Sequence, residues 1–215
     1  ISFDISPMPS RRPHTPKPMP APASLPRKRS EGPPSVGKPW GIVLRSPRET
    51  HRLGRWLGRF VQGGEVIALI GELGAGKTSL VRGIADGLLA EPASVSSPTF
   101  TLIHEYRGRL LLVHADLYRL TAAELEDTGL GDYLDGRTVT AIEWADRWGE
   151  NLASDRLDVH LSHHPSAVRR ALLTARGPSA RRLLMAVRSR LSPYRPTREP
   201  RQTRVQLTRP RRASH

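Results

Sequence analysis

The sequence contains no cysteine among its 215 residues, so it forms neither a disulfide framework nor a thiolate metal site. It has no apolar run that approaches the length of a membrane span, because the longest runs, VIALI and LLLV, are only strand-sized. The first residues lack the apolar central region of a secretory signal. These absences lead us to expect a cytoplasmic protein without a membrane partner.

Positive charge is abundant but unevenly placed along the chain. A formal net charge of +14 ordinarily indicates a nucleic-acid or membrane-surface partner. Residues 1–39 hold 7 Lys and Arg against 2 Asp and Glu, and residues 178–215 hold 11 against 1. Residues 40–177 hold 16 against 17. The charge excess therefore belongs to the two ends, and the middle has the balance of an ordinary globular domain.

The two ends also differ from the middle in composition. Residues 1–39 contain 11 of the 20 prolines, and residues 192–215 are rich in Arg and Pro. Proline breaks regular elements. The tails also contain too few apolar residues for their burial to offset the conformational entropy lost on ordering. We expect disordered tails at 1–39 and 192–215 around one domain at 40–191. The tails are either solvated extensions, which we favour, or basic arms that engage RNA phosphates.

Strand-like and helix-like patterns alternate between the tails. Buried or alternating runs predict strands at 41–46, 65–71, 99–106, 110–118 and 138–144, and two more within 157–177. Helical spacing of apolar residues predicts helices at 46–62, capped by Ser46, at 78–89, at 121–134, opened by Thr121, and at 179–191. This interleaving predicts an α/β fold with a mostly parallel central sheet and antiparallel additions.

The segment GELGAGKT (71–78) fits the pattern G-x-x-x-x-G-K-[ST] between a predicted buried strand and a predicted helix. Glycines let successive backbone N–H groups turn toward phosphate oxygens, and the helix adds its unpaired N–H groups and its positive dipole end. Lys77 is placed to reach the β- and γ-phosphates, and the Thr78 hydroxyl to bind Mg²⁺. The alternative is a glycine-rich turn with an exposed lysine.

Two carboxylates follow buried strands and are candidates to assist the chemistry. Asp116 comes after LLLVHA, and Glu143 comes after TVTAI. Both are expected at the carboxyl edge of the sheet, where one holds Mg²⁺ and the other orients an attacking water. The alternative for each is a strand-end carboxylate that caps a neighbouring helix. The segment SSPTFT (96–101) is either a plain turn, as its composition indicates, or a switch that touches the γ-phosphate.

Together these residues resemble one family. The resemblance rests on GELGAGKTSLVRG (71–83), SPTFTLIHEY (97–106), HADLYRL (114–120) and IEWADRW (142–148), with RETHRLGRWLG (48–58) as an opening helix. The order and spacing are similar to TsaE, also called YjeE, a small bacterial P-loop ATPase. That family is required for threonylcarbamoylation of the adenosine beside the anticodon in ANN-reading tRNAs. The resemblance covers residues 41–176, extends at most to 191, and includes neither tail.

The resemblance implies a P-loop NTPase-like three-layer sandwich and a set of site residues. Thr78 and Glu143 are implied to bind Mg²⁺, and Asp116 to support ATP hydrolysis together with Lys77. A late arginine is implied near the nucleotide, either Arg169 or Arg170. Pro47 to Thr50 are implied near the nucleotide base. The residues implied to contact ATP are Thr50, Leu73, Gly74, Ala75, Gly76, Lys77, Thr78, Thr99, Trp144 and Arg169.

The resemblance also implies partners. TsaE binds the TsaD–TsaB synthase, meets tRNA only through that complex, and supports repeated turnover by hydrolysing ATP. ATP binding would favour the complex and hydrolysis would reset it. A small-molecule or nucleoside kinase is the alternative, although no arginine-rich lid is evident. A nucleic-acid-binding protein driven by its tails is a third hypothesis, with weak and salt-sensitive binding expected.

Overall fold

The computed structural model describes residues 36–90, 102–121, 124–125, 128–163 and 168–191. Nearly all of both predicted tails lies outside these ranges. Val36 forms a β-bridge with Arg176, and the Gly37 N–H donates to the Ala175 carbonyl over 2.9 Å. Pairing with the sheet therefore begins four residues before the predicted domain start at residue 40.

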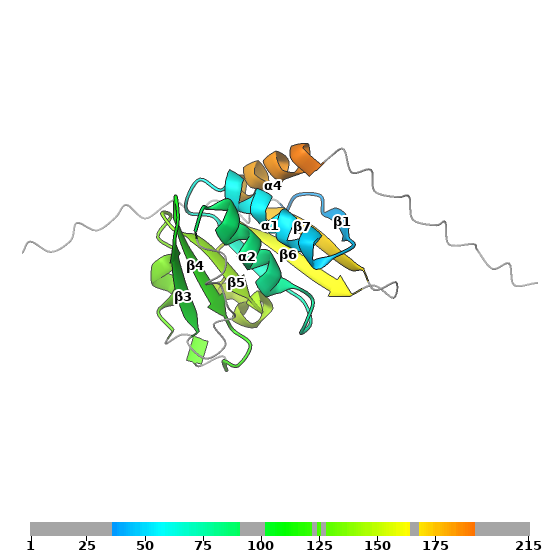
Figure 1. The fold of residues 1–215 in the computed structure, drawn as a ribbon. Coiled ribbons are helices and arrows are strands. Elements are labelled where there is room, and N and C mark those ends of the chain that lie inside the picture. Colours follow the sequence, from blue (N-terminus) through cyan, green and yellow to red (C-terminus); the bar gives the residue numbers. More distant parts are fainter. Residues whose placement is uncertain (1–35, 91–101, 122–123, 126–127, 164–167, 192–215) are drawn as a thin grey trace, which may run out of the picture. The chain divides into compact units, whose positions relative to one another are not determined.

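A seven-stranded sheet forms the centre of the domain, in the order β1-β7-β6-β2-β5-β4-β3 (Figure 1). Its four middle strands, β6, β2, β5 and β4, run parallel, whereas β1, β7 and β3 join the edges antiparallel. This is the predicted parallel sheet with antiparallel additions. The strands are β1 (Trp40–Leu44), β2 (Val66–Ile70), β3 (Ile103–Arg107), β4 (Leu111–Asp116), β5 (Val139–Glu143), β6 (Arg156–His163) and β7 (Arg169–Arg176).

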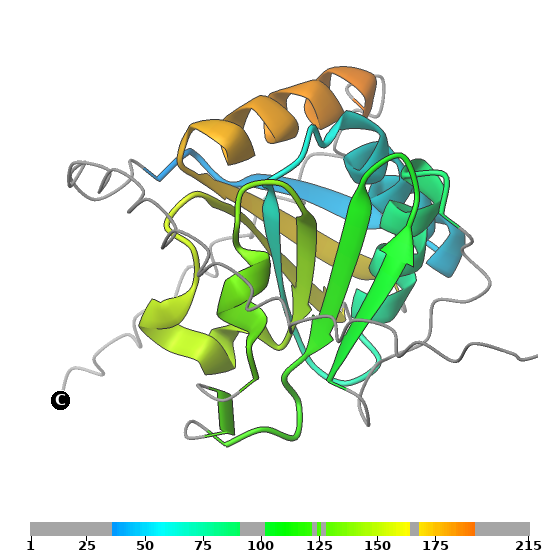
Figure 2. The same cartoon turned by 90° about the vertical axis from the view of Figure 1, so that its left-hand side faces the viewer.

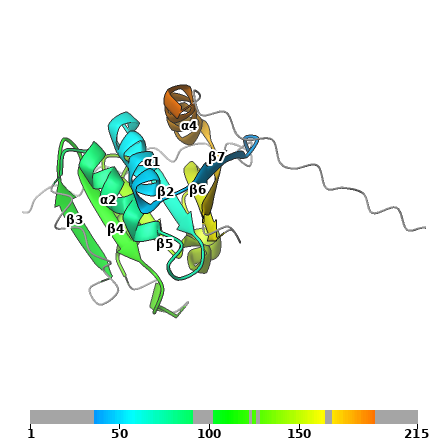
Figure 3. The ribbon, with the colours of Figure 1, turned by 45° about the vertical axis from the view of Figure 1, so that its right-hand side comes forward.

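Three helices cover one face of the sheet: α1 (Pro47–Phe60), α2 (Lys77–Gly87) and α4 (Pro178–Leu191). Figure 3 shows α1 between α2 and α4. The other face is covered by two short 3₁₀ helices, η2 (Leu130–Tyr133) and η3 (Ala145–Asn151), and by the segment after β4 (Figure 2). The result is the three-layer sandwich that the resemblance implies.

The apolar residues of β2 contribute to the cores on both faces of the sheet, because side chains alternate along a strand. Ile67 and Leu69 belong to the core beneath the helices, whereas Val66 and Ala68 belong to the core beneath η2 and η3. A strand buried on both faces therefore reads as a continuous apolar run. This places β2, and the loop that follows it, in the middle of the sheet.

Helices α1 and α2 approach each other backbone to backbone through glycines. Gly54 and Gly58 on α1 face Gly83 and Gly87 on α2 across the contact. A Cβ at Gly54 would fall 2.1 Å from the Leu80 carbonyl oxygen, far inside contact distance. Since α2 begins at Lys77, at the end of the loop formed by residues 71–78, this packing fixes the position of that loop against α1.

The turn between β3 and β4 ties both helices to the sheet. The Arg109 guanidinium donates to the carbonyls of Gly58 and Val61 at the end of α1, over 2.8 and 2.5 Å. Its backbone N–H donates to the Leu88 carbonyl, just after α2, over 2.7 Å. These bonds satisfy carbonyls that a helix end leaves without an internal partner.

The predicted elements are confirmed within a few residues wherever the structure describes them, and Ser46 caps α1 as expected. The predicted helix at 121–134 is not continuous. Thr121 and Glu124 form a reciprocal capping pair, but Gly129 adopts a left-handed conformation and only η2 follows it. No helix in the described parts of the chain has the length and apolar character needed to cross a membrane.

Candidate functional site

The loop Gly71–Thr78 connects the end of β2 to the start of α2, as the motif requires. Gly71 has φ +147° and passes so close to β6 that a Cβ would fall 2.2 Å from the Leu161 carbonyl oxygen. Gly76, the residue before α2, has φ +105° and no side chain to cap the helix. The first-turn N–H groups of α2 are therefore available to an anion.

Lys77 lies inside this loop and is buried. Its ammonium donates to the carbonyls of Gly71 and Glu72 over 2.6 and 3.0 Å, and it sits 3.7 Å from the ring centroid of Trp144. Burial lowers the pKa of Lys77 from its ordinary value, an effect that Glu143 and Asp116 oppose by charge attraction. The loop thus holds a desolvated cation at its centre, where a phosphate group would be bound.

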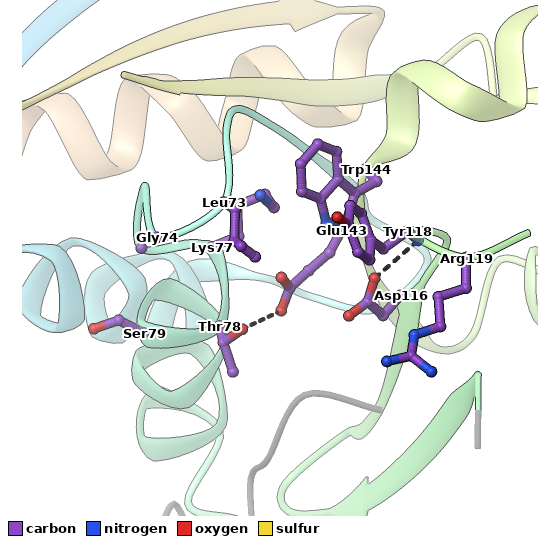
Figure 4. Close-up of a pocket in the computed structure, with 11 residues that line it drawn as sticks. Leu73, Gly74, Lys77, Thr78, Ser79, Asp116, Tyr118, Arg119, Glu143 and Trp144 are labelled. Carbon is purple, nitrogen blue, oxygen red and sulfur yellow. Dashed lines mark hydrogen bonds between the residues drawn. The ribbon is translucent and has the colours of Figure 1, made fainter. Parts of the chain in front are cut away.

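The two candidate carboxylates lie side by side at the carboxyl ends of β4 and β5, where Asp116 pairs in register with Glu143. Glu143 reaches the loop, because its Oε1 accepts a hydrogen bond from the Thr78 hydroxyl over 2.8 Å (Figure 4). The Asp116 Oδ1 accepts from the Tyr118 backbone N–H over 3.0 Å. The strand pattern left the roles of these two carboxylates open, and the resemblance implied Glu143 for the metal. The geometry places Glu143 beside the hydroxyl that would bind Mg²⁺.

His114 is a third member of this group that sequence reasoning did not single out. It is fully buried, and its Nε2 lies 2.9 Å from the Glu143 Oε1. The signal was present, because His114 precedes Asp116 by two residues and so points to the same side of β4. His114 and Thr78 hold the Glu143 carboxylate between them.

Thr50 and Arg169 meet the other side of the loop at Gly76. A Cβ at Gly76 would lie 3.4 Å from Arg169 Nε and 3.5 Å from Thr50 Cγ2. The Thr50 hydroxyl and Arg169 Nε are buried and have no hydrogen-bond partner among the described residues. Arg170 lines a hollow with His160 and Ser162 instead. The structure therefore selects Arg169 over Arg170 as the arginine at the loop.

A cavity of about 530 Å³ lies in front of the loop. Trp144 borders it with φ +57°, a left-handed conformation that is uncommon for a bulky residue and that often marks functional sites. The Tyr118 ring lies 4.8 Å from the Trp144 ring. Tyr118, Arg119 and Ser79 lie within the motifs HADLYRL and GELGAGKTSLVRG, but they were not predicted to be site residues. The lining consists of Leu73, Gly74, Gly76, Lys77, Thr78, Ser79, Asp116, Tyr118, Arg119, Glu143 and Trp144.

The remaining predicted residues divide between two places. Ala75 is buried inside the loop, and the Pro47 carbonyl lies 3.5 Å from the Ser79 hydroxyl, at the start of α1. Thr99 and the whole SSPTFT segment lie outside the described residues. The predicted loop, both carboxylates and Trp144 are thus brought together at one cavity, and Thr50 and Arg169 lie beside the loop at Gly76.

The site suits a nucleotide phosphate chain with Mg²⁺. Two buried polar atoms beside the loop, the Thr50 hydroxyl oxygen and Arg169 Nε, have no hydrogen-bond partner among the described residues. Buried polar groups in folded proteins are nearly always hydrogen-bonded, so these two atoms are suited to contact a ligand. No cluster of three His, Asp or Glu side chains suited to a metal occurs in the described parts of the chain. Mg²⁺ does not require one, because it is usually held by one or two carboxylates, phosphates and water. Thr78 and Glu143 are the residues that would hold it.

Comparison with known proteins relates this chain to one family. A family model described as "Threonylcarbamoyl adenosine biosynthesis protein TsaE" matches residues 44–172. The tRNA threonylcarbamoyladenosine biosynthesis protein TsaE of Bacillus subtilis (strain 168) is 40% identical over 139 residues, which cover 64% of this chain and 85% of that protein. The protein of the same name from Nostoc sp. is 42% identical over 139 residues, covering 62% and 84%. A crystal structure of Bacillus subtilis YdiB superimposes with a TM-score of 0.61 and 32% identity, covering 74% of this chain and 98% of that one.

Proposed function

This chain belongs to the TsaE family of threonylcarbamoyl adenosine biosynthesis proteins, and we propose that it is the component that binds and hydrolyses ATP in that tRNA modification system. On this proposal it does not transfer the threonylcarbamoyl group. It drives repeated turnover of a TsaD–TsaB synthase and works in the cytoplasm.

The observation that carries the proposal is the contact of Thr78 with Glu143 at the start of α2. A hydroxyl on the phosphate loop and a carboxylate on the neighbouring strand form the pair that holds Mg²⁺ in P-loop NTPases. When bound, Mg²⁺ neutralises charge on the phosphate oxygens. The loop amides bind the phosphates, and Lys77 adds positive charge beside them.

Asp116 is suited to orient the attacking water. It lies beside Glu143 in the sheet, lines the same cavity, and is buried. Its Oδ1 is fixed by the Tyr118 N–H. A fixed carboxylate at this edge accepts a hydrogen bond from water and aligns it with the terminal phosphate. We assign Asp116 to hydrolysis and Glu143 to the metal.

The proposed function requires the nucleotide to act as a switch. In this structure Lys77 is bound to two loop carbonyls and covered by the Trp144 ring. A nucleotide acts as a switch only when it binds two states of the protein with different affinity. We propose that the ATP-bound state is the one that favours TsaD–TsaB, and that hydrolysis releases it.

The test measures ATP hydrolysis by the full chain with and without purified TsaD–TsaB. We expect slow hydrolysis by the chain alone, faster hydrolysis with the pair, and its loss in Asp116→Asn with ATP binding retained. Asp132→Asn, which changes an exposed carboxylate on η2, is the matched control and should behave as wild type. Efficient phosphate transfer to a nucleoside or sugar, independent of TsaD–TsaB, would instead establish the kinase alternative.

A further inference from the structure

A stripe of arginines runs along the solvent face of α1. Arg48, Arg52, Arg55 and Arg59 are all exposed, and their spacing of four, three and four residues places them on one side of the helix. The stripe extends for about 16 Å at the helical rise of 1.5 Å per residue. It lies on the side opposite the buried residues, Leu53 and Leu57, that α1 packs into the core.

The neighbouring helices extend this charge on both sides. Arg82 is exposed on α2, and α4 exposes Arg181, Arg182, Arg188 and Arg190. Glu49 and Asp86 are the acidic residues within the three helices, and both are partly buried. Glu49 pairs with Arg52 over 3.8 Å and Asp86 pairs with Arg55 over 3.2 Å, so both acidic residues form ion pairs with arginines of α1. The outer face of α1, α2 and α4 therefore carries nine exposed arginines against two acidic residues. We call it the helix-layer arginine surface.

Two of these arginines converge on one aromatic side chain. The guanidinium carbons of Arg59 and Arg190 lie 5.1 and 5.6 Å from the ring centroid of Trp56, and Trp56 stacks on Phe60 at 5.8 Å. Cation–π contacts of this kind restrict long side chains. The α1–α4 junction therefore presents two partly ordered guanidinium groups, so less side-chain entropy is lost when they bind a ligand.

The near-neutral charge balance of residues 40–177 gives no indication of this surface. That segment holds 17 acidic residues, but only Glu49 and Asp86 belong to the helix layer. Glu65, Asp116, Glu143 and Asp158 are buried. Since α4 also leads into the Arg-rich residues 192–215, the positive charge of the helix layer continues along the chain.

We propose that the helix-layer arginine surface binds RNA through its phosphate backbone. All nine cations are arginine, whose planar guanidinium pairs with phosphate through two parallel hydrogen bonds. The stripe is long enough to meet several phosphates along one strand. The choice of RNA over other polyanions rests on the proposed function in tRNA modification. Such binding adds a direct contact with RNA to the indirect one, through the TsaD–TsaB complex, that the resemblance implies. The surface is distinct from the cavity at the phosphate loop, and none of its nine arginines lines that cavity.

The test measures binding of a fluorescein-labelled, unmodified tRNA transcript to the full chain by anisotropy, over a series of salt concentrations. The variant is the triple change Arg59→Gln, Arg188→Gln and Arg190→Gln. The control is Arg201→Gln, Arg204→Gln and Arg209→Gln, which removes the same charge from the C-terminal segment. We expect the helix-layer variant to bind at least roughly tenfold more weakly, with the salt slope reduced by about 3, and the control to change much less.

A second triple, Arg52→Gln, Arg182→Gln and Arg188→Gln, keeps the Trp56 contacts and serves if the first variant folds poorly. Equal losses in helix-layer and control variants would overturn the proposal, as would displacement of the RNA by poly-glutamate at equal charge. The proposal would also be overturned if the chain bound vesicles of equal parts phosphatidylcholine and phosphatidylglycerol more strongly than the tRNA, and if the helix-layer variant weakened that binding. ATP binding should be unchanged in every variant, so a failure here leaves the ATPase proposal standing.

Discussion

The Thr78 hydroxyl donates a hydrogen bond to Glu143 Oε1 over 2.8 Å, although the two residues are 65 positions apart in the chain. The bond joins the phosphate loop, at the end of β2, to the end of the adjacent strand β5. Loop and carboxylate are therefore held in a fixed relation by the sheet itself. Thr78 and Glu143 are the two side chains that would hold Mg²⁺ at this edge of the sheet.

Replacing Glu143 by Gln should weaken Mg²⁺ more than the nucleotide. The substitution keeps the size of the side chain and an oxygen that accepts from Thr78, but it removes the charge. We expect ATP affinity in the presence of Mg²⁺ to fall at least about tenfold, because loss of even an outer partner of a metal ligand typically costs about 10–100-fold in metal affinity. Titration calorimetry with and without Mg²⁺ measures this, with Glu105→Gln as the control. Equal loss under both conditions would contradict a metal role.

His114 should act on the metal through Glu143. Removing it as His114→Ala leaves the buried carboxylate without one donor, which costs about 1–3 kcal/mol of unfolding free energy. Mg²⁺ affinity should also fall by roughly 10–100-fold. In His114→Gln the amide nitrogen takes the place of Nε2 and should restore much of the Mg²⁺ affinity. If His114→Gln bound Mg²⁺–ATP as weakly as His114→Ala, the hydrogen bond to Glu143 would not be the cause. His114 would then contribute only through its packing.

Lys77→Ala should abolish measurable ATP binding, because the loop loses the cation that it holds at its centre. Lys38 is the other lysine in the described residues and is exposed, so Lys38→Ala is the matched control. Equilibrium binding of a fluorescent ATP analogue measures both. Normal binding by Lys77→Ala would show that the phosphate site lies elsewhere.

The glycine contact between α1 and α2 should be essential for stability. A methyl group at Gly54 meets the Leu80 carbonyl at 2.1 Å, so Gly54→Ala forces the helices apart and should lower the free energy of unfolding by about 3 kcal/mol. Gly131 has no atom within 4 Å of an added Cβ. Gly131→Ala should stay within about 0.5 kcal/mol of wild type in the same urea titrations. A stable Gly54→Ala protein would mean that the helices do not pack this closely.

Much of this site could be predicted because its chemistry is local in sequence. GELGAGKT lies within eight residues between a strand and a helix, and Asp116 and Glu143 each end a recognisable apolar run. The residue pattern alone could not say which carboxylate meets Thr78, because that depends on strand order, and only the family resemblance implied Glu143. It could not choose Arg169 over Arg170, because a shift of one residue reverses the face of a strand.

Two further features could not be fully read from the sequence, for related reasons. The spacing from Asp116 places His114 on the same side of β4, but its partner Glu143 is recognised only once β4 and β5 are paired. The helix-layer arginine surface depends on which helices share a layer, whereas a charge count treats buried and exposed residues alike. Both features result from tertiary packing, which cannot be read from the composition of the sequence.

The central claim is that ATP controls the association of this chain with TsaD–TsaB. Size-exclusion chromatography of the three proteins, with ATP and Mg²⁺ or without nucleotide, tests it most directly. The account predicts a three-protein peak with ATP, little or none without it, and none for Lys77→Ala under either condition. Co-elution that is the same with and without ATP, or that survives in Lys77→Ala, would contradict it.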